Sequence, residues 1–263
     1  MASLSRLRKG WVIQVRVIGA LMLRELTTRF GRENIGFLWV MAEPLLFAVL
    51  VGVMWRVMKG PLEHGVDIVA FVITGYIPLV FFRMSISRAV MAFTANSSFL
   101  YHQQIKILDL ILVRLFVEMI GHMMAYLFIA IILIALGYFP FPYDIGFVVL
   151  GWLYYSIFTF SITMIVAPLS ELSEFLEKIV PVTTYLMIPF SGAFYLVGLL
   201  HPAAANVVLY SPPVHGMEMM RYGVFGPSIN PQFEFLYPLE FCLPCLALGL
   251  LLCRIVRKRL VIE

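Results

Sequence analysis

Charged residues are scarce in this chain. Only 13% of its 263 residues are Asp, Glu, Lys or Arg, whereas 62% are hydrophobic. A soluble domain has about 25% charged and about 45–50% apolar residues. Because stretches of about 20 apolar residues cross a bilayer, this balance indicates an integral membrane protein with little room for a soluble domain.

The chain also lacks the motifs of nucleotide sites and of the common hydrolytic enzymes. It contains no G-x-x-x-x-G-K-[ST] sequence, and none of its glycines is followed by lysine. It likewise contains no H-E-x-x-H, G-x-S-x-G or G-x-G-x-x-G sequence. We therefore expect no catalytic, cofactor or metal site in this chain, so a partner or an ion gradient would have to drive any uphill transport.

Cysteine is rare, with only three residues, Cys242, Cys245 and Cys253, all near the C-terminal end. Their spacing matches neither a secreted disulfide framework nor a zinc site. The pair Cys242 and Cys245 is formally C-x-x-C, but its apolar surroundings favour simple packing in a membrane helix over a redox role.

Long apolar runs are abundant and predict an all-α membrane fold. Six segments are candidate spans: 37–58, 66–93, 107–136, 145–169, 179–200 and 233–253. Basic residues cluster before the first span and after the last, which places both termini in the cytoplasm by the positive-inside rule. The net charge of +4 follows from this distribution, so we expect no nucleic-acid partner.

The stretch before the first span is periodic. Apolar residues recur every three or four positions, with arginines on the other faces, which is typical of a helix in the membrane interface; the apolar positions are Leu4, Leu7, Trp11, Val15, Ile18, Met22, Leu26 and Phe30. A helix packed on a protein partner would show the same pattern. The stretch has no continuous apolar core and no small-residue cleavage site, so it is not a signal peptide.

A charged group ends this helix beside the first span. It comprises Arg24, Glu25, Arg29 and Arg32. Glu43 follows inside the span, about 10 Å from its start. A carboxylate at that depth reaches back to the arginines, so an ion pair that holds or gates this region is expected.

Segment 201–232 is rich in proline, too polar for a span and too apolar for an exposed loop. We expect short broken helices that re-enter the outer half of the membrane, covered by protein or by a water-filled cavity. Five tyrosines lie in or near the outward halves of the spans and this segment: Tyr76, Tyr185, Tyr195, Tyr210 and Tyr222. They form either an interfacial belt or a track for carbohydrate.

Ionisable residues inside spans are usually functional. Glu118 and His122 lie four residues apart, on one face of the third span. They are either a proton relay or a structural pair at a helix contact.

Three stretches resemble one family. "LRELTTRFGRENIGFLWVMAEP" (23–44), "ANSSFLYHQQIKILDLILVR" (95–114) and "SPPVHGMEMMRYGVF" (211–225) are similar to those of ABC-2 permeases. The resemblance is strongest to the capsular polysaccharide export permeases of Gram-negative bacteria. Lys106-Ile-Leu-Asp109 lacks the proline that is common in the second stretch, and Ser211 replaces an asparagine in the third.

The resemblance implies an interface helix at 1–33, an ABC-2 transmembrane domain at 34–256 and a cytoplasmic tail at 257–263. It implies a homodimer in the bacterial inner membrane with two copies of a separate ATPase, which would hold the ATP and Mg. Periplasmic adaptor and outer-membrane export proteins are implied as further partners.

The resemblance also implies roles for residues. A coupling helix at about 96–109 would contact the ATPase through Asn96, Phe99, Leu100, Tyr101, Lys106 and Asp109. The re-entrant helices would place His215, Glu218 and Arg221 near the channel exit, with the five tyrosines. We expect Arg24, Glu25, Arg29, Arg32 and Glu43 to form the cytoplasmic gate through which an acidic, lipid-linked polysaccharide enters.

Three other functions remain open. Related permeases export O-antigen or teichoic acid. An ion-coupled carrier would depend on Glu118 or His122 and would not need an ATPase. A membrane enzyme acting on lipid-linked sugars would require a catalytic constellation, which we do not recognise in the sequence.

Overall fold

The computed structural model describes residues 2–30, 36–60, 62–63, 65–93 and 105–260. In these segments the chain is almost entirely helical, as predicted. The β-structure found there is one antiparallel hairpin, in which β1 (Leu62–Glu63) pairs with β2 (Val66–Asp67).

Four of the described helices are long and apolar enough to cross a membrane. They are α3 (Ile68–Val90), α5 (Ile107–Ala135), α6 (Ile145–Leu172) and α10 (Leu236–Leu260). The predicted first span lies in α2 (Gly36–Lys59). Aspartate caps set the first residues of two of these helices: Asp67 and Asp144 accept hydrogen bonds from the first turns of α3 and α6. As a result α3 begins two residues after the predicted start, whereas α6 begins at the predicted residue, Ile145.

The predicted fifth span, 179–200, is not one continuous helix. Its first part belongs to α7 (Glu174–Leu186), whose 13 residues rise about 20 Å, less than the apolar core of a bilayer. Two short 3-10 turns follow, η2 (Ile188–Phe190) and η3 (Val197–Leu199). The helix stops because Pro189 disfavours helical backbone at Ile188, and Gly192 then adopts a φ of 77°.

The proline-rich segment forms short helices, as predicted. They are α8 (Pro202–Leu209), α9 (Pro212–Phe225) and the 3-10 turn η4 (Gly226–Ile229). Each begins with proline at its first or second position, where the missing N–H costs no helical hydrogen bond.

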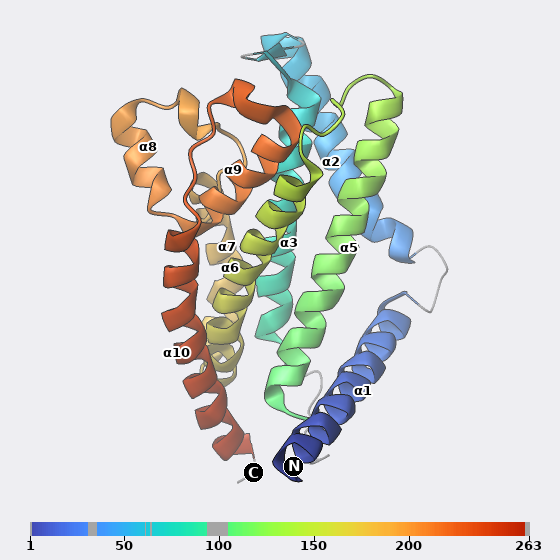
Figure 1. Cartoon of the computed structure of the whole chain (residues 1–263), viewed down its shortest axis with the longest axis vertical. Coiled ribbons are helices and arrows are strands. Elements are labelled where there is room, and N and C mark those ends of the chain that lie inside the picture. The colour runs from blue at the N-terminus through green and yellow to red at the C-terminus, as the bar shows by residue number, and fades with distance from the viewer. Residues whose placement is uncertain (1, 31–35, 61, 64, 94–104, 261–263) are drawn as a thin grey trace.

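The long helices stand side by side, and both chain ends lie at the same end of the bundle (Figure 1). We call this the termini end; α8, α9 and the hairpin lie at the opposite end. The helix α1 (Ala2–Phe30) lies at the termini end and packs on α5. Its Trp11 and Leu23 are exposed, whereas Leu21 is buried.

The centre of the bundle is α3, which packs against α2, α5, α6 and α7. On the other side, α6 lies very close to α9. A β-carbon added at Gly151 would come within 2.5 Å of the Gly216 carbonyl oxygen, so this crossing requires glycine. The fold thereby joins α9 rigidly to a long apolar helix.

Candidate functional site

Charged side chains of three helices meet in the half of the bundle nearer the termini. We call this group the inner charged cluster: Arg24 and Glu25 of α1, Arg88 of α3, and Arg114, Glu118 and His122 of α5. Arg114 donates a hydrogen bond to the Arg88 carbonyl oxygen and lies within the electrostatic reach of Glu25 and Arg24. The charges of α1 therefore face a charged face of α5.

Glu118 and His122 are both buried, and Glu118 is only 1% exposed. Arg88 places its Nε atom 2.7 Å from Glu118 Oε1, and His122 Nδ1 lies 3.5 Å from Glu118 Oε2. The same His122 nitrogen is 2.9 Å from the Glu118 carbonyl oxygen. Since a guanidinium already neutralises the carboxylate, this geometry supports the structural pair rather than the proton relay.

Asp109 lies in the first turn of α5 and is 1% exposed. Its carboxylate accepts a hydrogen bond of 2.9 Å from the Lys106 backbone N–H and another from the Gln14 side chain of α1. In the single chain Asp109 is turned inward and ties α1 to the start of α5, and its expected contact with an ATPase stays a prediction. Lys106 itself is exposed and remains accessible to a partner.

Several predicted site residues cannot be placed. Asn96, Phe99, Leu100, Tyr101 and Arg32 lie outside the described residues. Arg29 and Glu43 belong to the helices α1 and α2, but their side chains are outside the described part of the structure.

At the opposite end, Arg221 of α9 is fully buried. It donates hydrogen bonds of 2.6 Å to the carbonyl oxygens of Gly192 and Ala193, and its guanidinium lies 4.3 Å from the centroid of the Phe71 ring of α3. Burial lowers the pKa of Arg221 to about 10, while the neighbouring Glu218 opposes that shift. Arg221 thus satisfies backbone carbonyls that no regular helix pairs.

Glu218 and His215 have similar roles. Glu218 is fully buried, 3.9 Å from Arg221, and accepts N–H groups of Val197 and Gln232. Burial raises the pKa of Glu218, and Arg221 partly reverses this. His215, Glu218 and Arg221 are all buried in the single chain and bound to backbone, and their expected position near a channel exit stays a prediction.

His215 contacts backbone through both ring nitrogens. Its Nδ1 accepts the Glu234 N–H at 2.9 Å, and its Nε2 lies 2.9 Å from the Leu209 carbonyl oxygen. A neutral ring with the proton on Nε2 satisfies both contacts. Burial correspondingly lowers the pKa of His215.

The five tyrosines have different surroundings in the single chain. Tyr76 stacks on Phe47 of α2 with ring centroids 4.2 Å apart, and Tyr185 lies under the Arg83 guanidinium at 3.9 Å. Tyr222 packs edge-on against Phe147 of α6. Tyr210 is 76% exposed beside α8, and Tyr195 is half-buried beside the Arg221 contacts.

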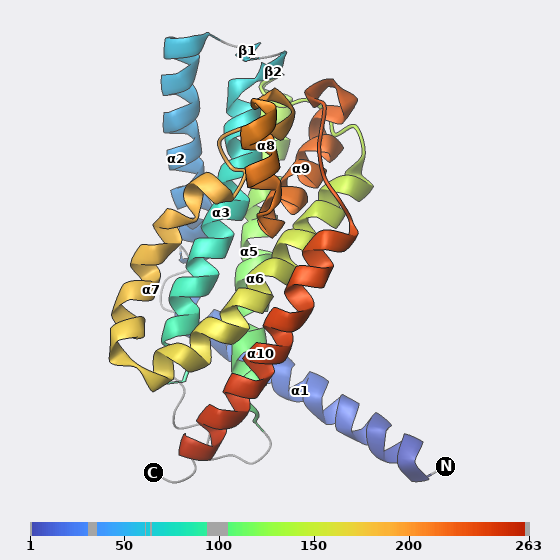
Figure 2. The ribbon, with the colours of Figure 1, turned by 90° about the vertical axis from the view of Figure 1, so that its left-hand side faces the viewer.

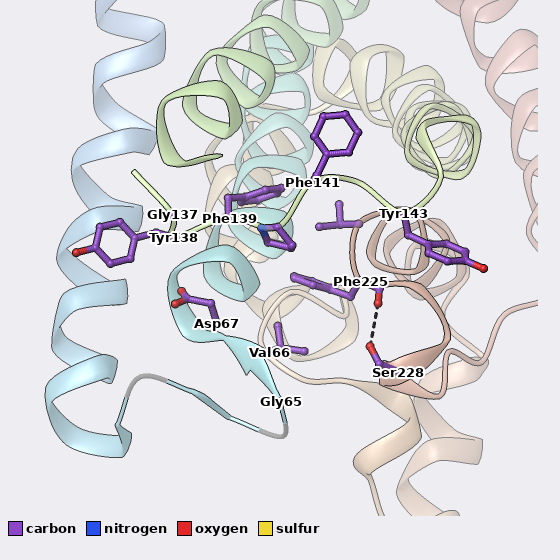
Figure 3. A pocket seen from close by; sticks show the side chains of 12 residues that line it. Gly65, Val66, Asp67, Gly137, Tyr138, Phe139, Phe141, Tyr143, Phe225 and Ser228 are labelled. Atoms are coloured by element: carbon purple, nitrogen blue, oxygen red, sulfur yellow. Dashed lines mark hydrogen bonds between the residues drawn. The ribbon is translucent and has the colours of Figure 1, made fainter. Parts of the chain in front are cut away.

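A hollow of about 490 Å³ lies at the end opposite the termini (Figure 3). Phe139 and Phe225 lie at its centre, with Tyr138 and Tyr143 at its two sides. Two of its polar side chains are engaged: Asp67 accepts the Val69 N–H at 2.8 Å, and Ser228 donates to the Phe225 carbonyl at 2.8 Å. The hollow therefore offers mainly aromatic surface, with the exposed side chains of Tyr138 and Tyr143 at its sides.

In the described part of the chain, no group of His, Cys, Asp and Glu is arranged to hold a metal ion. The three cysteines are free thiols.

The model of the family described as ABC-2 type transporter matches residues 16–225. The chain belongs to this family. The resemblance inferred from the three stretches is thereby confirmed.

Relatives of this ABC-2 chain carry specific names. It is 39% identical to the capsule polysaccharide export inner-membrane protein CtrC of Neisseria meningitidis serogroup B, over 90% of this chain and 91% of the relative. It is 34% identical to the protein of the same description, BexB, of Haemophilus influenzae, over 84% of each chain. It is 26% identical to the polysialic acid transport protein KpsM of Escherichia coli, over 94% and 96%.

Two contacts of this ABC-2 fold do not follow from the sequence patterns described above. Arg83 lies inside α3, with its guanidinium over the ring of Tyr185. Gln14 was not singled out at all, although it binds Asp109. The sequence does carry a signal for Arg83, because it is a charged residue inside an apolar helix, seven residues before the end of that helix.

Proposed function

We propose that this chain is the permease subunit of an ATP-driven transporter that exports a lipid-linked capsular polysaccharide across the inner membrane. The observation that carries the proposal is its similarity, over nearly its whole length, to permeases named for capsule export. Membership of the ABC-2 family supports a transport role, with ATP hydrolysis in a separate subunit.

The proposed assembly contains two copies of this chain and two ATPases. The segment 96–109 would connect the ATPase to the bundle, because it leads directly into α5, and the exposed Lys106 is available for that contact. Asp109 would act indirectly, by fixing α1 to the same helix end. Periplasmic adaptor and outer-membrane export proteins would receive the polysaccharide.

The proposed topology has six crossings with both termini in the cytoplasm. Its support is the common position of the two termini and the basic residues beside them (Figure 1). The short α7 would complete the fifth crossing together with the turns η2 and η3, and α8 and α9 would re-enter the outer half of the membrane. Buried Arg221 supplies the hydrogen bonds that such irregular backbone needs.

The proposed entry gate lies where α1 meets α5. Arg24 and Glu25 face Arg114 there, and Arg29, Arg32 and Glu43 would extend the charged surface toward the first span. Positive groups at the headgroup level attract anionic lipids and acidic sugars. The cluster would therefore bind the lipid-linked end of the substrate as it enters.

Export of O-antigen is the second candidate. It is favoured by one observation, a 23% identity over 214 residues with the O-antigen export permease RfbA of Klebsiella pneumoniae. The identities to capsule exporters are higher and cover more of the chain.

The test replaces the permease gene in a capsule-forming strain that keeps its own ATPase. We expect this chain to restore surface capsule only together with a functional ATPase, ideally the one encoded beside this chain. A strain that restores O-antigen but not capsule supports the second candidate. Restoration of capsule in a strain with no functional ATPase would contradict both.

A further inference from the structure

Helix α3 is buried along most of its length, but five of its residues are half-buried: Tyr76, Arg83, Met84, Ser87 and Arg88. Steps of seven and four residues keep three of them, Tyr76, Arg83 and Ser87, within one narrow face, which we call the polar line. Met84 and Arg88 lie to one side of this line, and Arg88 pairs with Glu118.

This line runs where α2 and α7 approach α3. In Figure 2, α2 runs beside the upper part of α3 and α7 beside its lower part, and both helices contact α3. Tyr76 stacks on Phe47 of α2, and Arg83 stacks on Tyr185 of α7. The polar line therefore follows the side of α3 on which α2 and α7 pack.

Arg83 differs from the other arginines described in α3, α5 and α9. Arg88 is paired with Glu118, Arg114 donates to a carbonyl oxygen, and Arg221 donates to several. No hydrogen bond or ion pair joins Arg83 to another residue that the structure describes. Its guanidinium carbon lies 3.9 Å from the centroid of the Tyr185 ring.

The depth of Arg83 in the helix makes the lack of a polar partner among the described residues unusual. It lies seven residues before the end of α3, which is about 10 Å of helix. An unpaired guanidinium at that depth is costly in hydrocarbon, so its face is expected to border water or another polar group. Arg83 is itself half-buried, and the Tyr185 side chain that stacks on it is 56% exposed in the single chain.

We propose that Arg83, held by Tyr185 and flanked by Tyr76 and Ser87, is an anion-binding station inside the translocation path. The ring of Tyr185 covers one side of the planar guanidinium and fixes its orientation. The N–H edge stays available for two parallel hydrogen bonds to a carboxylate or a phosphate. Tyr76 and Ser87 supply polar surface on either side along the helix.

The proposal rests on the proposed export function, which supplies a passing chain that carries anionic groups. KpsM, one relative, is named for polysialic acid, a polymer of carboxylate sugars. The same carboxylate or phosphate chemistry could come from an acidic polysaccharide or from an anionic lipid headgroup. The experiment separates these sources.

The experiment uses the full chain with its ATPase in nanodiscs of phosphatidylethanolamine. Binding of fluorescent sialic acid oligomers and of neutral dextran is compared for the wild type and for Arg83→Gln, Arg83→Lys and Tyr185→Leu. We expect Arg83→Gln to lose about tenfold in oligosialic acid affinity, and Arg83→Lys to lose less because it keeps the charge. Dextran binding should not change.

The matched control is Arg254→Gln, which removes an exposed arginine of α10, a helix that packs on α6 and α9. It should bind like the wild type. A second arm adds phosphatidylglycerol and measures the lipid that co-purifies. Arg83-dependent retention of that lipid would identify the headgroup as the anion, whereas Arg83-dependent oligosaccharide binding would identify the polysaccharide.

The proposal is overturned if neither ligand depends on Arg83 in variants that still assemble with the ATPase. Failure of the export function gives a different pattern. In that case the wild type restores no capsule in cells, while anion binding still depends on Arg83. If Arg83→Gln restores capsule to the wild-type level and its anion binding is unchanged, the proposed role of Arg83 is contradicted but the export function is not.

Discussion

The Nε atom of Arg88 lies 2.7 Å from the Oε1 atom of Glu118, and this pair joins α3 to α5 inside the bundle. Glu118 is almost fully buried, and the arginine places a cation directly beside its carboxylate. This contact distinguishes the two interpretations of Glu118 and His122, which are a structural pair at a helix contact and a proton relay. A paired carboxylate holds helices together, whereas a relay needs a carboxylate that exchanges protons.

Replacing Glu118 with alanine should destabilise the chain by about 3 kcal/mol, because it removes the buried carboxylate that pairs with Arg88. Thermal unfolding in nanodiscs measures this loss. The double change Arg88→Met with Glu118→Leu should recover part of it.

Export should persist in His122→Ala, and export by the wild type should be insensitive to a protonophore that spares cellular ATP. Loss of export in His122→Ala together with protonophore sensitivity of the wild type would support the ion-coupled carrier instead.

The Asp109→Asn substitution should loosen α1 from α5. It weakens the cap at Lys106 and the bond to Gln14, so we expect a loss of about 1 kcal/mol and faster proteolysis between α1 and α2. Asp144→Asn is the matched control, since Asp144 caps α6 through Gly146 at 2.7 Å. Equal proteolysis of α1 in both variants would show that the Gln14 contact has no holding role.

The predicted helices agree best with the structure where the length of an apolar segment is enough to predict a membrane-spanning helix. The spans at 66–93, 107–136, 145–169 and 233–253 are all found as helices, because 20 or more apolar residues leave few alternatives. The prediction of one continuous helix over segment 179–200 was wrong. Its composition is apolar throughout, but Pro189 and Gly192 break it, and hydropathy does not register backbone geometry.

The candidate site was less predictable than the fold. Helical spacing correctly put Glu118 and His122 on one face, but it could not show that Arg88 from another helix neutralises the pair. His215, Glu218 and Arg221 were expected near a channel exit because the stretch that holds them resembles the re-entrant helices of ABC-2 permeases. Tertiary packing buries Arg221 against the carbonyl oxygens of Gly192 and Ala193, a contact across nearly 30 residues that no local pattern encodes.

Gly75→Ala should disrupt the attachment of α9 to α3. A β-carbon at Gly75 would lie 2.0 Å from the Ala193 carbonyl oxygen, so the backbone that Arg221 binds must shift. We expect a destabilisation of roughly 2–3 kcal/mol from overpacking. Gly19→Ala is the control, because nothing lies within 4 Å of its added carbon; thermal unfolding that treats both variants alike would contradict the account.

Stability should fall when the pH drops through the range in which His215 titrates. The pKa of His215 is lowered in the folded chain, so folding favours the neutral ring. Its contribution is present above the unfolded value near 6.5 and is lost as the pH falls through the lower folded value. Unfolding temperatures at pH 7.5 and pH 5 should differ less in His215→Gln; an unchanged difference would assign the effect to other groups.

The central claim is that this chain moves polysaccharide with energy from a separate ATPase. The most direct measurement is ATP hydrolysis by the purified chain in nanodiscs, alone and after co-expression with the ATPase encoded beside it. The account predicts no hydrolysis by the chain alone and activity in a stable complex with equal numbers of the two subunits. Hydrolysis by the chain alone, or no association with that ATPase, would contradict it.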